Sequence, residues 1–380
     1  MPSLFGQQYT REQLLRRVGR LSQVGGVQLL ACEDGPARGV RLLEFRTGSG
    51  LVFKVAIERG LDVGYCEYRG HSLAWIPPTK LPGPWYLEQP DGFGWLRSAL
   101  GGFNNTCGML HIGNPEEADV AHYNFPARPR DRYGVHDRAA MLPGQLTSYG
   151  ERWEGDECLI EAVGETVQAQ TYGENLRLTR RYTCRLGESR FCMHDTVENI
   201  GHLRASHMYL YHINAGFPFV DAGSELLAPF APDQPPRVLF GEVSQPDEYR
   251  SFVAPIRNWI QQTFQHSMRA EPDGRVPVAI VNPALNDGAG LGLYVVYHRP
   301  QMPNYIEWRM MGEGQYAVGI EPCTSGFGRA EVEAAGEMIW LEPGDRREYD
   351  LEVGILDGAE EIEAFRRRVA AAVAATAAGG

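Results

Sequence analysis

The chain has 380 residues, 22% of them charged, and a net charge of -12. Because a nucleic-acid-binding surface needs a cationic field, this balance argues against nucleic acid as a partner. No apolar run approaches the roughly 20 residues that span a bilayer, and charges interrupt the N-terminus where a signal peptide needs an apolar core, so we expect a soluble, cytoplasmic protein without a membrane partner.

Residues 1–26 are predicted to form an N-terminal helical segment. Thr10 precedes Gln13 by three positions, which is the spacing of a capping box, and the helix should run to about Val18. From residue 27 the sequence changes to short strands divided by turn sequences, at 27–33, 40–46, 51–57 and 63–68. This pattern is typical of an antiparallel meander.

Residues 76–150 lack regular periodicity. They are rich in Gly, Pro and Asn, yet they also hold Trp85, Trp95, Phe103 and His136. Disordered segments have few aromatic residues, and long ordered loops are usually functional. We therefore expect loops that build or cover a site.

Strands return after residue 157. Residues 176–186 alternate apolar and polar, with Arg180 as the exception on the apolar face, and the turn GES leads to a partner strand at 190–198. Further strands are predicted at 278–282, 290–298, 305–310, 316–321, 337–341 and 347–355, with Pro277 marking the start of the first. Residues 230–275 give only a weak helix signal.

Residues 357–380 are predicted as a C-terminal helix from Ala359, with Gly379 and Gly380 as its stop. Residues 27–356 then form one mainly β domain, a large antiparallel sandwich of stacked sheets.

The segment HMYLYHINAGFPF, residues 207–219, is the first candidate for chemistry. Its alternation puts His207 on one side of a strand and His212 on the other, at the end of an apolar row and just before the strand bends. An imidazole in that position suits the mouth of a pocket, although a histidine bonded to backbone carbonyls at a sheet edge is the simpler alternative.

A second strand, QYAVGIEPCTS, carries Glu321. Ala317 and Gly319 face the same way as Glu321, which should leave space above the sheet, and Pro322 is expected to end the pairing. In the preceding strand, Trp308 could provide a flat apolar platform for a sugar ring, although it could equally be core.

A Glu and a His form a usable acid/base pair, because their ordinary pKa values of about 4.3 and 6.5 lie near neutrality. Opening a cyclic hemiacetal needs one group to take the proton of the anomeric hydroxyl and another to protonate the ring oxygen. Such a reaction requires no metal or cofactor. We expect His212 and Glu321 on opposite sides of one ring-sized hollow.

Several segments together resemble the aldose 1-epimerase (galactose mutarotase-like) superfamily. They are LYHINAGFPF (210–219), GIEPCTSG (319–326) and IWLEPGDRREYDLEVGIL (339–356). ERGLDVGYCEYRG (58–70), GGFNNTCGMLHIG (101–113) and YGVHDRAAMLPG (133–144) are similar to its aldose-epimerase-like branch of DUF4432 type. The resemblance extends over residues 27–356, in order and in spacing.

The resemblance implies a β-supersandwich and a ring-form sugar as ligand. It also implies Glu321 as the general base, His212 as the general acid, and further residues that contact the sugar. The resemblance places His136, Arg138, Arg59 and Asp62 among the substrate-binding residues, and Asn105 and Trp308 complete the predicted set.

The chain departs from the family pattern at two points. GGFNNTCG offers Asn104 and Asn105 where mutarotases carry an Asn-Arg pair, and Asp137 replaces the glycine after His136. Three alternatives to mutarotation stay open: epimerisation or isomerisation of a keto-sugar, a metal-dependent isomerase, and a carbohydrate-binding protein without turnover.

Neither metal nor covalent chemistry has a strong sequence signal. The histidines show no tight ligand spacing, and the seven cysteines are scattered singly without a C-x-x-C pair, so we expect neither a metal site nor a disulfide framework. The predicted partner is a small carbohydrate. The oligomeric state is left open, with a homodimer favoured.

Overall fold

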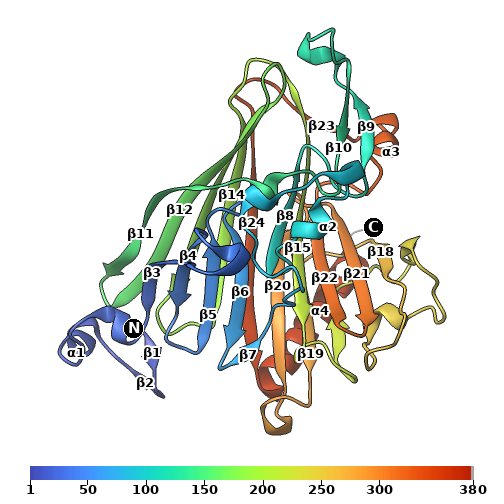
Figure 1. Cartoon of the computed structure of the whole chain (residues 1–380). Helices are drawn as coiled ribbons and strands as arrows, with labels where there is room; N and C mark the ends of the chain where they lie inside the picture. Colours follow the sequence, from blue (N-terminus) through green and yellow to red (C-terminus); the bar gives the residue numbers. More distant parts are fainter. Residues whose placement is uncertain (378–380) are drawn as a thin grey trace.

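The computed structural model describes residues 1–377, which form three antiparallel sheets and two short hairpins (Figure 1). The eight-stranded sheet has the order β11 (Gln145–Glu154), β12 (Glu157–Ala169), β13 (Asn175–Arg185), β14 (Arg190–Asn199), β24 (Arg346–Asp357), β20 (Leu291–His298), β19 (Arg275–Asn282) and β16 (Glu225–Leu227). The seven-stranded sheet has the order β17 (Arg237–Phe240), β18 (Gln262–His266), β21 (Asn304–Gly312), β22 (Gln315–Cys323), β15 (Ala205–Gly216) and β23 (Ile339–Leu341), and β8 (Asn104–Met109) also pairs with β15.

The remaining elements are smaller. The five-stranded sheet runs β3 (Gly26–Ala31), β4 (Arg41–Arg46), β5 (Leu51–Ala56), β6 (Asp62–Tyr68) and β7 (His71–Ser72). The hairpins are β1 (Ser3–Leu4) with β2 (Gln7–Gln8), and β9 (Glu116–Asp119) with β10 (Arg130–Tyr133). The α-helices are α1 (Arg11–Leu15), α2 (Trp95–Ser98), α3 (Arg329–Ala334) and α4 (Ala359–Ala377). The 3-10 helices are η1 (Leu21–Gln23), η2 (Gly35–Ala37), η3 (Pro84–Tyr86), η4 (Pro90–Gly92), η5 (Ala121–Tyr123), η6 (Ala139–Met141), η7 (Glu248–Arg250) and η8 (Asn286–Gly288).

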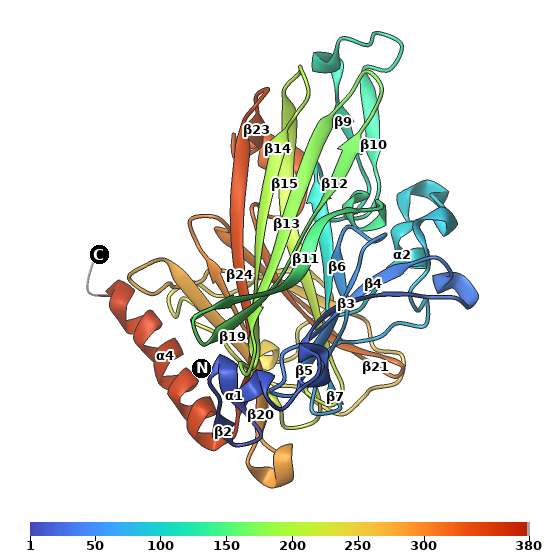
Figure 2. The same ribbon diagram turned by 90° about the vertical axis from the view of Figure 1, so that its left-hand side faces the viewer.

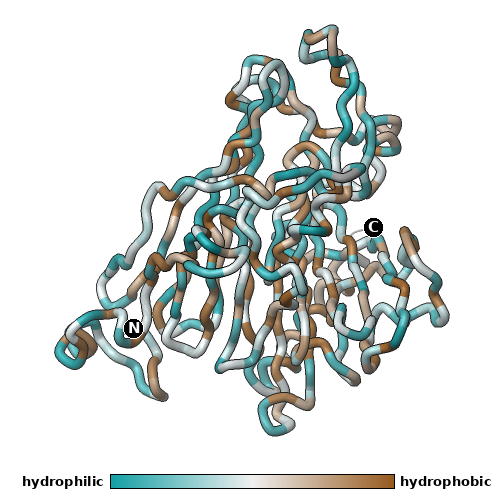
Figure 3. Tube along the Cα trace, viewed as in Figure 1, coloured by the Kyte–Doolittle hydropathy of each residue, from teal (hydrophilic) through white to brown (hydrophobic). Residues whose placement is uncertain are grey.

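The main core lies where the three sheets meet. Hydrophobic and hydrophilic residues alternate along many of the strands (Figure 3), and the buried rows of all three sheets pack together. Phe53 of the five-stranded sheet stacks on Phe45 beside it and on Phe191 of the eight-stranded sheet, with ring centroids 4.5 and 4.2 Å apart. This packing confirms a mainly β sandwich of stacked sheets.

Helix α4 lies along the outside of the eight-stranded sheet (Figure 2). Phe365 and Ile362 of the helix pack on Ala279 and Leu356 of the sheet. The helix begins at the predicted Ala359, and the predicted stop at Gly379 and Gly380 lies outside the described residues. No helix among the described residues has both the length and the apolar character needed to cross a bilayer.

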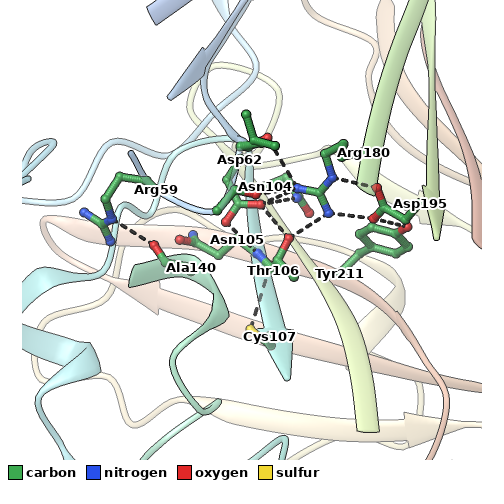
Figure 4. Close-up of polar contacts among 12 residues, drawn as sticks. Arg59, Asp62, Asn104, Asn105, Thr106, Cys107, Ala140, Arg180, Asp195 and Tyr211 are labelled. Atoms are coloured by element: carbon green, nitrogen blue, oxygen red, sulfur yellow. Dashed lines mark hydrogen bonds and ion pairs between the residues drawn. The ribbon is translucent and has the colours of Figure 1, made fainter. Parts of the chain in front are cut away.

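A buried ion network joins β13 and β14 to the seven-stranded and five-stranded sheets (Figure 4). The Arg180 guanidinium donates to Asp195 at 2.7 and 2.6 Å and to Asp62 Oδ1 at 2.7 Å. The hydroxyls of Tyr209 and Tyr211 on β15 donate to the same Asp195 carboxylate at 2.8 and 2.7 Å. Arg180, the exception on the predicted apolar face, therefore fixes the position of β15.

Some predicted boundaries were wrong. The Thr10 capping box is present, but the helix ends at Leu15. Pro277 lies inside β19, where it is tolerated because β16 pairs only with residues 279–281. Pro322 does not end the pairing, since it lies opposite Tyr305 and the strand continues to Cys323.

Two segments that the sequence left without strands contain them. The irregular region 76–150 includes β8, whose six residues are all buried. The weak helix signal in 230–275 corresponds only to the short 3-10 helix η7, and the strands β17 and β18 flank it.

Candidate active site

The pairing of β15 with β22 brings His212 and Glu321 together. Ile213 lies opposite Ile320, so the two neighbouring residues face the same side of the sheet. His212 Nε2 and Glu321 Oε1 are 3.2 Å apart, and the residues are only 7% and 1% exposed. The prediction that they stand on opposite sides of a ring-sized hollow was therefore wrong, because no sugar ring fits between two atoms in contact. A ligand has to lie over both groups.

Gly319 creates the room for the carboxylate. A Cβ at this position would collide with Glu321 Oε1 and would lie 3.0 Å from the Cβ of Trp308 on β21. The space above the small residues is therefore occupied by the Glu321 side chain itself. Trp308 lies opposite Gly319 in the register, and its ring centroid is 5.6 Å from that of His212.

Burial acts on the two groups in opposite senses. Loss of solvent raises the pKa of Glu321 well above its ordinary value, and the nearby Glu307 raises it further. Loss of solvent lowers the pKa of His212 to about 4. Both directions favour a neutral pair, with the exchangeable proton on the carboxyl group and a neutral imidazole. The pair holds one proton to donate and one nitrogen to receive another.

His136 is the third titratable group of the site. Its ring is 5.6 Å from that of His212 and nearly perpendicular to it. Burial lowers the pKa of His136 well below its ordinary value, so the ring is neutral. Its Nδ1 accepts the Gly113 N–H at 3.3 Å, which places the proton of the neutral ring on Nε2. His136 can thus donate a hydrogen bond from Nε2.

These residues line one pocket of about 640 Å³. His136, His212, Trp308 and Glu321 contribute to it, together with Trp95 of α2 and the loop residues Trp75, Pro77, Gly101 and Phe327. Within the protein, the buried Trp95 Nε1 and His212 Nδ1 have no hydrogen-bond partner, and Glu321 Oε1 has only its contact with Nε2. Buried polar atoms are normally satisfied, so these atoms indicate a polar ligand.

Arg59 and Asp62 do not line the pocket, contrary to the prediction. Arg59 is fully buried and donates to the carbonyl oxygens of Ala140, Pro82 and Ser98 at 2.8, 2.6 and 2.7 Å. Asp62 is fully buried as the partner of Arg180 (Figure 4). Both residues act within the fold.

Arg138 and Asn105 are also outside the pocket lining. Arg138 Nη2 is 3.0 Å from Glu174 Oε1 and donates to the Ala169 carbonyl at 2.7 Å. Asn105 lies opposite His212, but it is fully buried and its amide donates to the Gly101 carbonyl behind the pocket wall. Of the six predicted sugar-binding residues, the structure brings His136 and Trp308 to the His212–Glu321 pair.

The other histidines of this region have separate roles. His111 Nε2 contacts the Asn114 carbonyl at 2.6 Å, and His207 lies between the Met109 carbonyl and the Tyr349 hydroxyl at 2.8 and 2.6 Å. His122 packs on Tyr123 and Trp340. Within residues 1–377, no three His, Cys, Asp or Glu side chains are arranged as a metal-binding group.

Trp75 is a site residue that the sequence did not single out, because it lies just before the irregular region 76–150; its ring is 5.9 Å from that of Trp308. Trp95 was among the aromatic residues of the region expected to build or cover a site, and its ring is 5.1 Å from that of His136. The sequence assigned no separate role to Trp95.

Comparisons with known proteins agree with this architecture. The model of a family described as "Domain of unknown function (DUF4432)" matches residues 37–355. No curated protein sequence matches the chain. Among solved structures, a "putative aldose 1-epimerase" from Klebsiella pneumoniae has 20% identity and a TM-score of 0.80, with 91% of this chain and 87% of that chain covered.

Two further structures have lower similarity. A galactose mutarotase-like protein from Clostridium acetobutylicum has 13% identity and a TM-score of 0.56, over 87% of this chain and 99% of that chain. The galactose 1-epimerase from Lactobacillus acidophilus has 11% identity and a TM-score of 0.54, over 88% and 100%. At these identities the likeness shows a shared fold, which confirms the predicted galactose mutarotase-like β-supersandwich.

Proposed function

The chain belongs to the DUF4432 family, and from this premise we propose that it is an aldose 1-epimerase-like enzyme that opens and recloses the ring of a free sugar. The observation that carries the proposal is the buried contact of 3.2 Å between His212 and Glu321 at the base of a pocket. A fold can be shared by proteins of different activity, so the proposal rests on this site.

The mechanism uses the single proton of the pair. In ring opening, His212 takes the proton of the anomeric hydroxyl while the Glu321 carboxyl donates its proton to the ring oxygen. The ring then closes on the other face of the carbonyl. His212 returns its proton to the carbonyl oxygen, which becomes the anomeric hydroxyl, while Glu321 takes back the proton of the hydroxyl that attacks. The resemblance implied Glu321 as base and His212 as acid; here each group acts once as base and once as acid.

The surrounding residues have positioning roles in this proposal. His136 donates from Nε2 to a sugar oxygen, and the Trp308 face packs on the ring. A cytoplasmic location and a homodimer stay predictions. The seven cysteines, all free, support a reducing compartment.

The test is saturation-transfer NMR of anomer exchange over a panel of aldoses, ketoses and uronates. General acid–base catalysis contributes about 10²–10⁴-fold, so Glu321→Gln should lose at least about 100-fold on the best sugar. Wild-type exchange that matches Glu321→Gln on every sugar would refute the mechanism. Proton exchange at carbon, seen as deuterium uptake from D₂O, would instead identify a keto-sugar epimerase or isomerase.

The chain provides a matched control for this variant. Glu307 on β21 is also a buried carboxyl beside a histidine, with His266 Nε2 at 3.0 Å from its Oε2, but it lines no part of the pocket. Glu307→Gln makes the same chemical change in the same sheet. Burial is the larger cause of the raised pKa of Glu321 and Glu307 the smaller one, so this variant should keep activity within a few-fold of wild type. The comparison separates catalysis from the effect of removing a buried carboxyl.

A further inference from the structure

The pocket has almost no charge. Within the described part of the chain, no lysine, arginine or aspartate lines it, and Glu321 is its single carboxyl group. Nearby cations are occupied elsewhere: Arg138 contacts Glu174, and Arg309 donates to Gln262 at 2.7 Å and to the Ser251 carbonyl at 3.2 Å. A phosphate or carboxylate on the ligand would therefore be buried without a partner, which is strongly unfavourable.

One group of polar side chains lies at the catalytic end of the pocket, where Trp95 Nε1, His136 and the His212–Glu321 pair lie together. The remaining polar side chains of the lining are uncharged: Thr79, Asn114, Asn214, Gln261, Thr263 and Gln315. Asn214 donates to the Gly101 carbonyl at 3.0 Å and Gln261 accepts from Trp308 Nε1 at 2.7 Å, and each of these amides keeps a further hydrogen-bonding group.

Large apolar side chains gather at the opposite end of the pocket, beside Gln261 and Thr263. Met310 follows Trp308 by two positions on β21 and so faces the same side. Leu239 and Phe240 come from β17 at the edge of the same sheet, and Trp75 packs against Trp308 from the facing loop. Phe240 is half exposed at the rim. A ligand that reaches from the catalytic pair to Phe240 has to place apolar atoms here.

Building on the proposed function, we propose that the substrate is an uncharged ring-form sugar that carries an apolar group, either a deoxy carbon or an alkyl substituent, away from the reacting carbon. The anomeric hydroxyl and ring oxygen lie at the His212–Glu321 end. The apolar group lies on Trp308, Met310 and Phe240.

The experiment compares derivatives of one parent hexose, the best sugar of the panel. Binding is measured by calorimetry and anomer exchange by NMR for the parent, for its deoxy and O-methyl derivatives at each ring position remote from C1, and for its 6-phosphate and uronate. Burial of one CH₂ group gains about fourfold in affinity. We expect at least one deoxy or O-methyl derivative to bind at least fourfold more tightly than the parent, and both anionic sugars to bind at least tenfold more weakly.

Two variants test the placement of the apolar group. Phe240→Ala should reduce the affinity ratio between the preferred derivative and the parent at least threefold. Phe5→Ala removes another exposed phenylalanine, on the β1–β2 turn outside this pocket, and should leave the ratio unchanged. Met310→Lys should improve binding of the 6-phosphate by supplying a cation.

The outcomes separate the inference from the proposed function. Equal or tighter binding of the anionic sugars, or weaker binding of every deoxy and O-methyl derivative, would overturn the substrate class whether or not exchange occurs. The expected binding order without catalysis of anomer exchange on any sugar would support the substrate class and overturn the enzyme assignment.

Discussion

Replacement of Gly319 by alanine tests whether the backbone of β22 creates the space for the catalytic carboxyl. The added Cβ would collide with Glu321 Oε1 and would crowd the Cβ of Trp308 at 3.0 Å. Overpacking a filled site costs about 1–3 kcal/mol, while alanine in place of a strand glycine returns about 0.5–1 kcal/mol. We expect a net loss of unfolding free energy of up to about 2 kcal/mol.

The effect on activity should be larger than the effect on stability. Moving a catalytic group by about 1 Å can cost about 10²-fold in rate, so Gly319→Ala should lose anomer exchange by that order on the best sugar. Urea unfolding and saturation-transfer NMR measure the two effects on the same protein. Gly64→Ala on β6 is the control, because its Cβ would meet the Leu100 side chain at 3.5 Å, an ordinary contact. A Gly319→Ala protein with wild-type exchange would refute the placement of Glu321.

Three other predictions concern charges. Asp62→Asn leaves Arg180 with one anionic partner fewer and should lower the free energy of unfolding in urea by about 3 kcal/mol. The affinity of the folded protein for sugar should stay unchanged. Weaker sugar binding would show that Asp62 is a pocket residue after all. Burial raises the pKa of Asp137 from 3.8 to about 7, so this group favours folding below about pH 4 and loses that contribution as the pH rises towards 7. At 1.36 kcal/mol per pKa unit, the stability lost over this pH range is at most about 4 kcal/mol. In urea unfolding, Asp137→Asn should therefore be more stable than wild type at pH 8 but not at pH 4. Because the pKa of His212 is lowered to about 4, kcat/KM should be constant from about pH 5 to neutrality and should fall near pH 4. A fall centred at pH 6.5 would contradict a buried neutral imidazole.

Local periodicity was sufficient to predict the strands that carry His212 and Glu321. His212 and Glu321 each end an alternating row, and alternation depends only on neighbours in the chain. The strand β8 had no such signal, because its residues Asn104 to Cys107 are small or polar. They are buried by partners elsewhere, with Thr106 bonded to Asp62 through both its N–H and its hydroxyl.

Local periodicity could not predict the roles of the buried charged residues. Asp62 resembled a pocket residue from its motif, but its partner Arg180 is 118 positions away. The contact between His212 and Glu321 likewise depends on the register of two strands more than a hundred residues apart, and the sequence does not contain that register. Motifs identified chemical groups; the pairing of distant strands decided which of them meet.

All twelve residues of β15 are buried, with Tyr209 and Tyr211 attached to the Asp195 carboxylate on one face and His212 on the other. Any shift of this strand would break both phenolic hydrogen bonds, so the imidazole is a fixed reference point within the molecule. Any movement that accompanies ligand binding then has to come from the opposing segments, the loop that carries Trp75 and the helix α2 that carries Trp95. Liganded and empty forms of the protein should superpose along the seven-stranded sheet and diverge only across the pocket from it.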